Sequence, residues 1–124
     1  MVSLEYIAGF FDGEGCINVS YCPPHHFQVQ LIIGNTDRNV LAEIQKVLGG
    51  KLHCCKTKTN KHHDLWVLQW NSFAEAKTVL RILCPHLLVK REKAMLALAL
   101  LDLHKPKIVT EEERILLKVL LPKT

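Results

Sequence analysis

Two carboxylates stand close together near the start of the chain, in a segment that also holds several glycines. Asp12 and Glu14 follow a largely apolar stretch, residues 7–11, whose spacing predicts a helix. Gly13 and Gly15 are expected to end this helix. Negative charge is unfavourable at the C-terminal end of a helix, and a bound cation would remove that penalty. Since carboxylate oxygens are the ligands that Mg²⁺ prefers, the segment predicts chemistry that uses a divalent ion.

Small residues give the same predicted helix a second feature. Gly9 and Gly13 are four residues apart, one above the other on a helix, and Ala8 widens this stripe of small side chains. Each glycine inside a helix costs roughly 1 kcal/mol relative to alanine, so a repeated glycine needs a structural reason. A second helix that packs closely against the stripe supplies one. We therefore expect a second helix to approach closely at Ala8, Gly9 and Gly13.

The elements that must position these residues follow from the hydrophobic pattern of the rest of the chain. The sequence predicts a helix over 4–15, strands over 16–22 and 27–33, a helix over 37–48, strands over 51–58 and 64–71, and helices over 73–83, from beyond Pro85 to about His104, and over 115–121. This order predicts one α+β domain over residues 1–124, with an antiparallel sheet covered by helices on one face and polar on the other. Ser72 with Glu75 and Thr110 with Glu113 predict capping boxes at the starts of two of the later helices. The apolar run 95–101 is expected to be buried.

The segment with the two carboxylates resembles the signature of a known family. Residues 7–15, Ile-Ala-Gly-Phe-Phe-Asp-Gly-Glu-Gly, resemble the nine-residue motif of the LAGLIDADG homing endonucleases, and the predicted order of elements is similar to the family's αββαββα core. The resemblance implies a site-specific homing endonuclease that makes a metal-dependent, staggered double-strand cut in a long DNA target. The implied cofactor is Mg²⁺, which Mn²⁺ or Ca²⁺ can replace for binding.

Residue roles follow from the same resemblance. It implies that Glu14, at the eighth motif position, ligates the metal, with a backbone carbonyl near Gly13 as a further ligand, whereas Asp12 caps a helix end. Asn35 matches a polar residue that orders the attacking water, although it could instead be a helix N-cap. Lys90 matches a lysine near the scissile phosphate. Its competitors for that role are Arg91 and Lys93, and a solvent-exposed helix face is the alternative for all three.

One copy of the motif provides half of such a site. Two chains must therefore pair, which predicts a homodimer and a palindromic or pseudo-palindromic target. The residues expected at the interface between the two chains are Ala8, Gly9, Asp12 and Gly13. The polar side chains of the first hairpin suit base edges in the major groove, and the lysines around the second hairpin suit phosphates. The predicted DNA-binding residues are Asn18, Ser20, Gln28, Gln30, Lys51, Lys56 and Lys58. A formal net charge of +4 agrees with double-stranded DNA as a partner, and a simple solvent-exposed sheet face is the alternative.

Composition and cysteine content narrow the class of protein. The longest apolar run, 94–101, is shorter than the roughly 20 residues that cross a membrane, and an odd number of cysteines, 5, favours free thiols. We expect a soluble intracellular protein, in an organelle or in a bacterial or phage-host cytoplasm. Two other functions stay open. One is a DNA-binding protein that does not cleave, such as a maturase or transcription factor. The other is an interaction module stabilised by a zinc ion. Its ligands would come from His53, Cys54, Cys55, His62 and His63, although the spacing of these residues is unfavourable for a zinc site.

Overall fold

The computed structural model describes residues 2–22, 26–55, 65–103 and 110–121, and it confirms the predicted α+β class. In chain order the elements are α1 (Leu4–Glu14), β1 (Gly15–Cys22), β2 (His26–Asn35), α2 (Arg38–Leu48), β3 (Lys51–Cys55), β4 (Leu65–Trp70), α3 (Phe73–Leu83), the short 3₁₀ helix η1 (Cys84–His86), α4 (Arg91–Leu103) and α5 (Glu111–Leu120). The elements α1 to α3 form the αββαββα core. The predicted turn between β3 and β4 lies outside the described residues.

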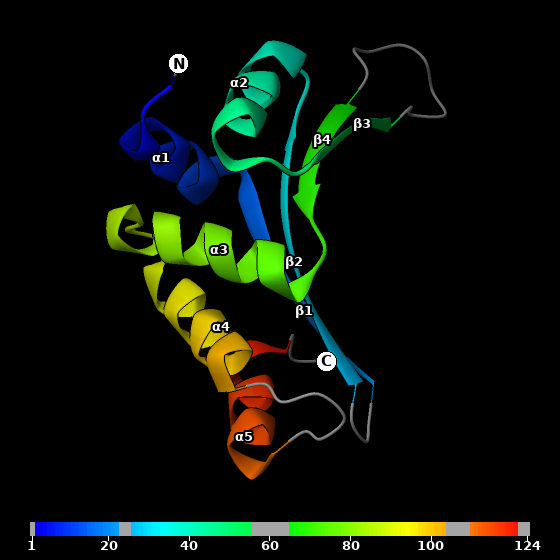
Figure 1. The fold of residues 1–124 in the computed structure, drawn as a ribbon, viewed down its shortest axis with the longest axis vertical. Helices are drawn as coiled ribbons and strands as arrows, with labels where there is room; N and C mark the ends of the chain where they lie inside the picture. The colour runs from blue at the N-terminus through cyan, green and yellow to red at the C-terminus, as the bar shows by residue number, and fades with distance from the viewer. Residues whose placement is uncertain (1, 23–25, 56–64, 104–109, 122–124) are drawn as a thin grey trace.

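The four strands form one antiparallel sheet in the order β1-β2-β4-β3. The two hairpins therefore meet through β2 and β4, in a register that pairs Leu31 with Trp70 and Gly34 with Val67. Figure 1 shows the helices gathered on one side of the sheet, with α3 crossing the strands and α4 below it. We call the opposite side of the sheet its open face.

Alternation along the strands separates the open face from the core. Residues of the predicted apolar face are almost completely buried against the helices, and the best examples are Ile17, Val19, Phe27, Val29, Leu31, Ile33, Leu68 and Trp70. Their neighbours in sequence point the other way, because successive strand residues face opposite sides of a sheet. Burial of this apolar area is the main force that holds the helices on the sheet. No helix in the described part of the chain is long and apolar enough to cross a membrane.

Side-chain caps define where the helices begin. The predicted capping pair Ser72 and Glu75 is present at α3, and Thr110 and Glu113 form a capping box at α5. Thr110 therefore starts α5 at Glu111, earlier than the apolar pattern alone predicts. One burial prediction is wrong. Met95 is 57% exposed, because α4 turns only part of its apolar surface toward the core.

Two glycines make the tight connection between α2 and β3. Gly49 and Gly50 have φ angles of 72° and 99°, in the left-handed region where glycine is favoured. A Cβ atom on Gly50 would lie 2.7 Å from Nε1 of Trp70, so the chain also needs the missing side chain for space. The same Nε1 donates a hydrogen bond to the carbonyl oxygen of Leu48 at 3.2 Å. The end of α2 is thus fixed against the middle of the sheet.

Candidate active site

The C-terminal end of α1 brings the first candidate residue to the edge of the sheet. Glu14 is the last residue of α1, it is exposed, and no described residue forms a hydrogen bond or ion pair with it. Gly15 begins β1 with no intervening turn and pairs with Ile33. A Cβ atom on Gly15 would lie 2.5 Å from the ring of Phe11, so only glycine fits this direct junction. The Glu14 carboxylate is therefore free to bind a ligand at a well-defined place.

Asp12 fastens this helix end to a distant part of the chain. Its carboxylate accepts hydrogen bonds from the backbone N–H groups of Leu88 at 2.7 Å and Lys90 at 3.0 Å. Burial, the largest single influence, raises the pKa of Asp12, but hydrogen bonds from backbone N–H groups of residues 88–90 and the charge of Lys90 together hold the pKa below its ordinary value. Asp12 is thus an ionised anchor for the segment before α4, and it does not cap its own helix.

The side chain of Lys90, from the segment just before α4, also contacts the C-terminal end of α1. Its Nζ donates a hydrogen bond to the backbone carbonyl oxygen of Asp12 at 2.6 Å. The carbonyls of a last helical turn have no partner within the helix, and a cation there is also favoured by the helix dipole. Arg91 instead donates to the carbonyl oxygen of Pro85 at 2.9 Å, and Lys93 is exposed. Of the three basic candidates, Lys90 is the one that the structure brings to the α1 end next to Glu14.

Asn35 lies nearby but takes part in a turn. It is the last residue of β2, two positions beyond Ile33, and Ile33 is the partner of Gly15. Its Oδ1 accepts a hydrogen bond from the backbone N–H of Asp37 at 2.8 Å. Asp37 in turn is the N-cap of α2, so the predicted alternative that made Asn35 the N-cap is wrong. Asn35 orders the turn that leads into α2 through its oxygen, and its side-chain nitrogen is not used by that bond.

The open face carries the predicted base-reading residues on its β1–β2 half. Asn18 lies opposite Gln30, and Ser20 lies opposite Gln28. Asn18, Ser20 and Gln28 are exposed, whereas Gln30 is half-buried and donates from Nε2 to Oδ1 of Asn71 at 3.1 Å. The sequence prediction missed Asn71, because the residue follows the last strand and only the sheet register brings it beside Gln30. These five residues form one polar patch.

The other half of the open face is less polar. The row that crosses all four strands there contains Cys16, Ile32, Gln69 and Lys51. Lys51 is exposed, as a phosphate contact requires. Lys56 and Lys58 lie outside the described residues. The described structure therefore places Asn18, Ser20, Gln28 and Gln30 on β1 and β2 and an exposed lysine at the far edge of the sheet.

The stripe of small residues on α1 is only partly at the surface. Gly9 and Gly13 are exposed, and a Cβ atom on either would have no atom within 4 Å apart from its own helix and chain neighbours. Packing inside the described chain thus gives no reason for glycine at these two positions. Ala8 is different, because its side chain is fully buried in the chain's own core. The prediction that Ala8 contacts a second chain is corrected, since it lies behind the stripe.

A comparison with protein-family models decides the family of the chain. Residues 7–94, more than half of the chain, match the model described as LAGLIDADG endonuclease. The chain belongs to the LAGLIDADG endonuclease family. A comparison with curated proteins finds no match.

Solved structures of LAGLIDADG proteins share the fold of this chain. Homing endonuclease I-CvuI, crystallised with a target in the presence of 2 mM Mg with the DNA not cleaved, is 23% identical at a TM-score of 0.66, over 94% of this chain and 93% of its own. Meganuclease I-AabMI, bound to uncleaved DNA, is 25% identical at a TM-score of 0.76, over 96% of this chain but 44% of its own. Homing endonuclease I-TnaI is 18% identical at a TM-score of 0.64, over 97% of this chain and 96% of its own.

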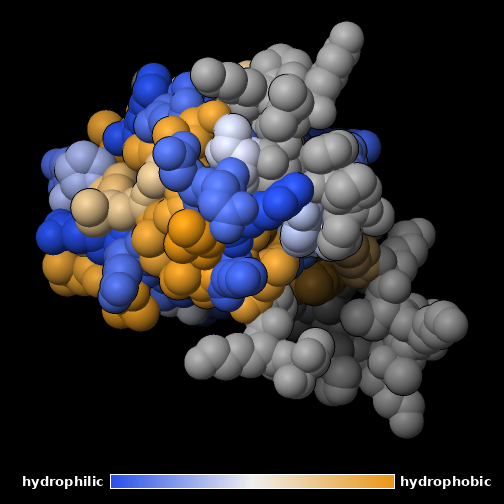
Figure 2. Space-filling model, turned by 90° about the horizontal axis from the view of Figure 1, so that it is seen from below, coloured by the Kyte–Doolittle hydropathy of each residue, from blue (hydrophilic) through white to orange (hydrophobic). Residues whose placement is uncertain are grey.

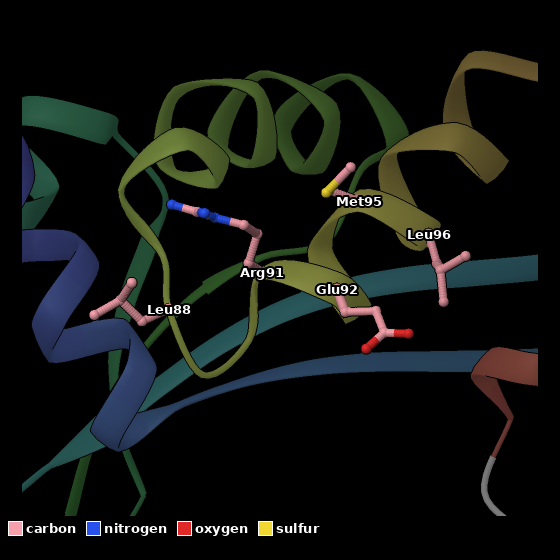
Figure 3. A pocket seen from close by; sticks show the side chains of 5 residues that line it. All are labelled: Leu88, Arg91, Glu92, Met95 and Leu96. Carbon is pink, nitrogen blue, oxygen red and sulfur yellow. The ribbon is translucent and has the colours of Figure 1, made fainter.

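An apolar surface flanks the LAGLIDADG helix α1. Leu88 and Val89 are each 80% exposed, although hydrogen bonds to Asp12 hold their backbone in place. Figure 3 shows the open hollow of about 380 Å³ that begins at Leu88 and continues along α4 to Met95. A second hollow joins Val89 to the end of α5. Seen from below, the molecule shows apolar residues gathered at its surface among hydrophilic ones (Figure 2).

The predicted zinc cluster receives no support from the described part of this LAGLIDADG chain. His53 and Cys55 are neighbours on one side of β3, with Sγ and Nδ1 4.0 Å apart. Cys54 points to the other side of the strand, as alternation requires. His62 and His63 lie outside the described residues. Among the residues that are described, no group of three or more His, Cys, Asp or Glu side chains is arranged to hold a metal ion.

Proposed function

We propose that this chain is a homing endonuclease that acts as a homodimer, each subunit being a single domain over residues 1–124. The observation that carries the proposal is the arrangement at the end of α1. Glu14, an exposed carboxylate without a partner among the described residues, sits at the end of the family motif, and the Lys90 ammonium is fixed within two residues of it. A free acid beside a fixed cation suits the hydrolysis of a phosphodiester, in which negative charge builds up on the phosphate.

The groups at this helix end also fit a divalent ion. The side chain of Glu14 and the terminal backbone carbonyl of Gly13 offer only oxygen ligands, which hard cations such as Mg²⁺ prefer. The relative I-CvuI has been crystallised with its target in the presence of Ca as well as Mg. When bound, such an ion lowers the pKa of a water molecule and stabilises charge on phosphate oxygens. The chain's part is to hold the ion through Glu14 and Gly13 and to neutralise the phosphate through Lys90.

Asn35 has a supporting role in the proposal. Its oxygen is occupied by the N–H of Asp37, so the side-chain nitrogen is the group left to hydrogen-bond a water molecule. The turn holds the side chain in place before DNA arrives. Asn35 thus orders water near the site and at the same time fixes the start of α2.

Three observations support the homodimer. Gly9 and Gly13 leave the surface of α1 open to a close helix approach. Leu88 and Val89 add a highly exposed apolar surface next to it, of the kind that marks an interaction site. The fold of this chain covers 93% of I-CvuI and 44% of I-AabMI, so a unit of the size of I-AabMI would take two copies of the fold. A two-fold dimer of this kind binds a pseudo-palindromic DNA target and cuts both strands with a stagger.

The open face would lie on this target. In I-CvuI, I-AabMI and other relatives the solved complexes contain DNA. Amide side chains such as Gln28 pair with base edges in the major groove, whereas Lys51 suits the phosphate backbone. The site-specificity of the enzyme comes from the polar patch, and its general affinity comes from the basic residues.

Replacing Glu14 by Gln tests the proposed reaction. The change keeps the shape and removes the charge, so Mg²⁺-dependent cleavage of a selected DNA duplex should be lost while binding in Ca²⁺ is kept. Glu112→Gln makes the same change at an exposed position of α5, distant from the motif, and should cleave normally. Wild-type protein that binds a selected duplex but cleaves it in neither Mg²⁺ nor Mn²⁺ would instead be a non-cleaving DNA-binding protein on the same scaffold.

Gly13→Leu tests the dimer. The leucine would stand on the exposed surface where the second helix must approach, so sedimentation should show monomers. Ala74→Leu places the same side chain on an exposed position of α3 and should leave the dimer intact. A wild-type protein that stays monomeric on its DNA target would exclude the shared site.

A further inference from the structure

A row of carboxamide side chains crosses the open face near the middle of the sheet. Asn18 in β1 lies opposite Gln30 in β2. The last pair between β2 and β4 is Leu31 with Trp70, so Gln30 and Asn71 stand opposite each other one step further along. Neighbouring strands are about 4.8 Å apart, which is close enough for such side chains to touch. We refer to Asn18, Gln30 and Asn71 as the amide row.

A hydrogen bond fixes one member of the amide row. Nε2 of Gln30 donates to Oδ1 of Asn71 at 3.1 Å, and both residues are half-buried. A glutamine amide has two N–H donors and one oxygen acceptor, and this bond uses one donor. In this arrangement Nε2 of the Gln30 amide faces Asn71, and its oxygen does not. The oxygen and the second N–H of Gln30 stay available to a ligand.

The oxygen and the second N–H of Gln30, which the bond to Asn71 does not use, match the hydrogen-bonding groups of one base. In the major groove adenine presents the N6 donor next to the N7 acceptor, and a glutamine amide pairs with both through its oxygen and one N–H. Without the bond to Asn71, half a turn of the amide exchanges oxygen and nitrogen with almost no change of shape. We propose that Asn71 is a positioning residue that orients Gln30 and so makes Gln30 a reader of adenine. This inference rests on the proposed DNA-binding function.

The test measures base preference and does not depend on cleavage. A duplex selected by the wild-type protein from a randomised library, and all of its single-base variants, are bound in the presence of Ca²⁺. Gln30→Ala identifies the base pair that Gln30 reads. Asn71→Ala should reduce the preference for adenine at that pair by about 2- to 10-fold, the worth of one orienting hydrogen bond, and should leave the other pairs unchanged.

A second substitution separates orientation from mere packing. Asn71→Asp keeps an oxygen acceptor at the same place, so it should hold Gln30 in the same orientation and keep the preference for adenine. Its negative charge should weaken binding to all duplexes alike. Unchanged preference for adenine in Asn71→Ala, or loss of that preference in Asn71→Asp, would overturn the proposal. Thermal unfolding of each variant shows that the fold is retained.

Combined variants complete the test. In Gln30→Ala protein, Asn71→Ala should have no further effect on the profile. In Gln28→Ala protein it should keep its full effect, because Gln28 lies on the same face opposite Ser20 and not beside Asn71. An effect of Asn71→Ala that persists without Gln30 would mean that Asn71 reads the base itself, which contradicts a positioning role. Wild-type protein that prefers no duplex sequence would instead refute the proposed function.

Discussion

Replacing Asp12 by alanine tests how firmly the end of α1 is fastened to the start of α4. The carboxylate accepts hydrogen bonds from the N–H groups of Leu88 at 2.7 Å and Lys90 at 3.0 Å. The bond to Leu88 is exposed, so water can replace it and its loss costs about 0.5 kcal/mol. The bond to Lys90 is partly buried, and an N–H group left without a partner there costs about 1.5 kcal/mol. The variant should therefore lose about 2 kcal/mol of unfolding free energy.

Denaturant unfolding at pH 7 and at one fixed protein concentration measures this loss, since pairing of chains also adds stability. In a thermal scan it corresponds to a midpoint lower by roughly 8 °C, at about 4 °C per kcal/mol for a chain of this size. Asp12→Asn retains one oxygen acceptor and should lose about half as much. If Asp12→Ala unfolds within about 0.5 kcal/mol of the wild type, the two bonds do not fasten the helix end and the reasoning fails.

The effect of Asp12 also has a defined pH dependence. The pKa of Asp12 in the folded protein lies below its ordinary value of 3.8. A carboxyl with a lowered pKa stabilises the fold fully above the pKa of the unfolded chain, and this stabilisation is lost as the pH falls through the folded pKa. The difference between wild type and Asp12→Ala should be constant from about pH 7 to 5 and should shrink below pH 3.8. A difference that grows on acidification would contradict the assignment.

Three other predictions address the turn, the surface ion pairs and the sheet face. Gly50→Ala should destabilise the protein by roughly 1–3 kcal/mol in denaturant unfolding and more than Gly49→Ala, since both strain a left-handed φ but only Gly50 meets the Trp70 indole. Asp102→Asn breaks exposed ion pairs from Asp102 to Lys77 and Arg81, so the thermal midpoint should barely change, and any change should disappear in high salt. Lys51→Ala should reduce the slope of log affinity against log salt for DNA by about 0.9, whereas Gln28→Ala should leave that slope unchanged.

The sequence predicted the features that depend on neighbouring residues. Spacing of apolar residues located α1, the strands and α2, and the pairs Ser72 with Glu75 and Thr110 with Glu113 located two helix starts. The motif residues Glu14 and Gly13 lie in one short segment, and the structure places both at the end of α1. Such features are encoded within a few residues of the chain, where periodicity and capping chemistry act directly.

The features that the sequence could not predict depend on contacts between distant segments. Asp12 meets Leu88 across 76 residues, and Gln30 meets Asn71 across 41, so neither contact leaves a local pattern. Leu88 and Met95 belong to apolar stretches typical of a core, yet both are exposed because Leu87 and the buried residues of α4 are the ones that pack into the core there. Which apolar residues the core accepts is decided by packing in three dimensions.

The direct junction at Gly15 fixes the distance between Glu14 and the polar side chains of β1. Because α1 passes into β1 without a loop, Glu14 and the polar side chains of β1 belong to one continuous rigid segment. A strand rises about 3.4 Å per residue, so Asn18 stands roughly 13 Å and Ser20 roughly 20 Å along the chain from Glu14. Stacked bases have nearly the same spacing along one strand of DNA, about 3.4 Å. With a duplex lying along β1, the fold would therefore set a fixed number of base pairs between Glu14 and the polar side chains of β1, and one residue inserted after Gly15 would change that number.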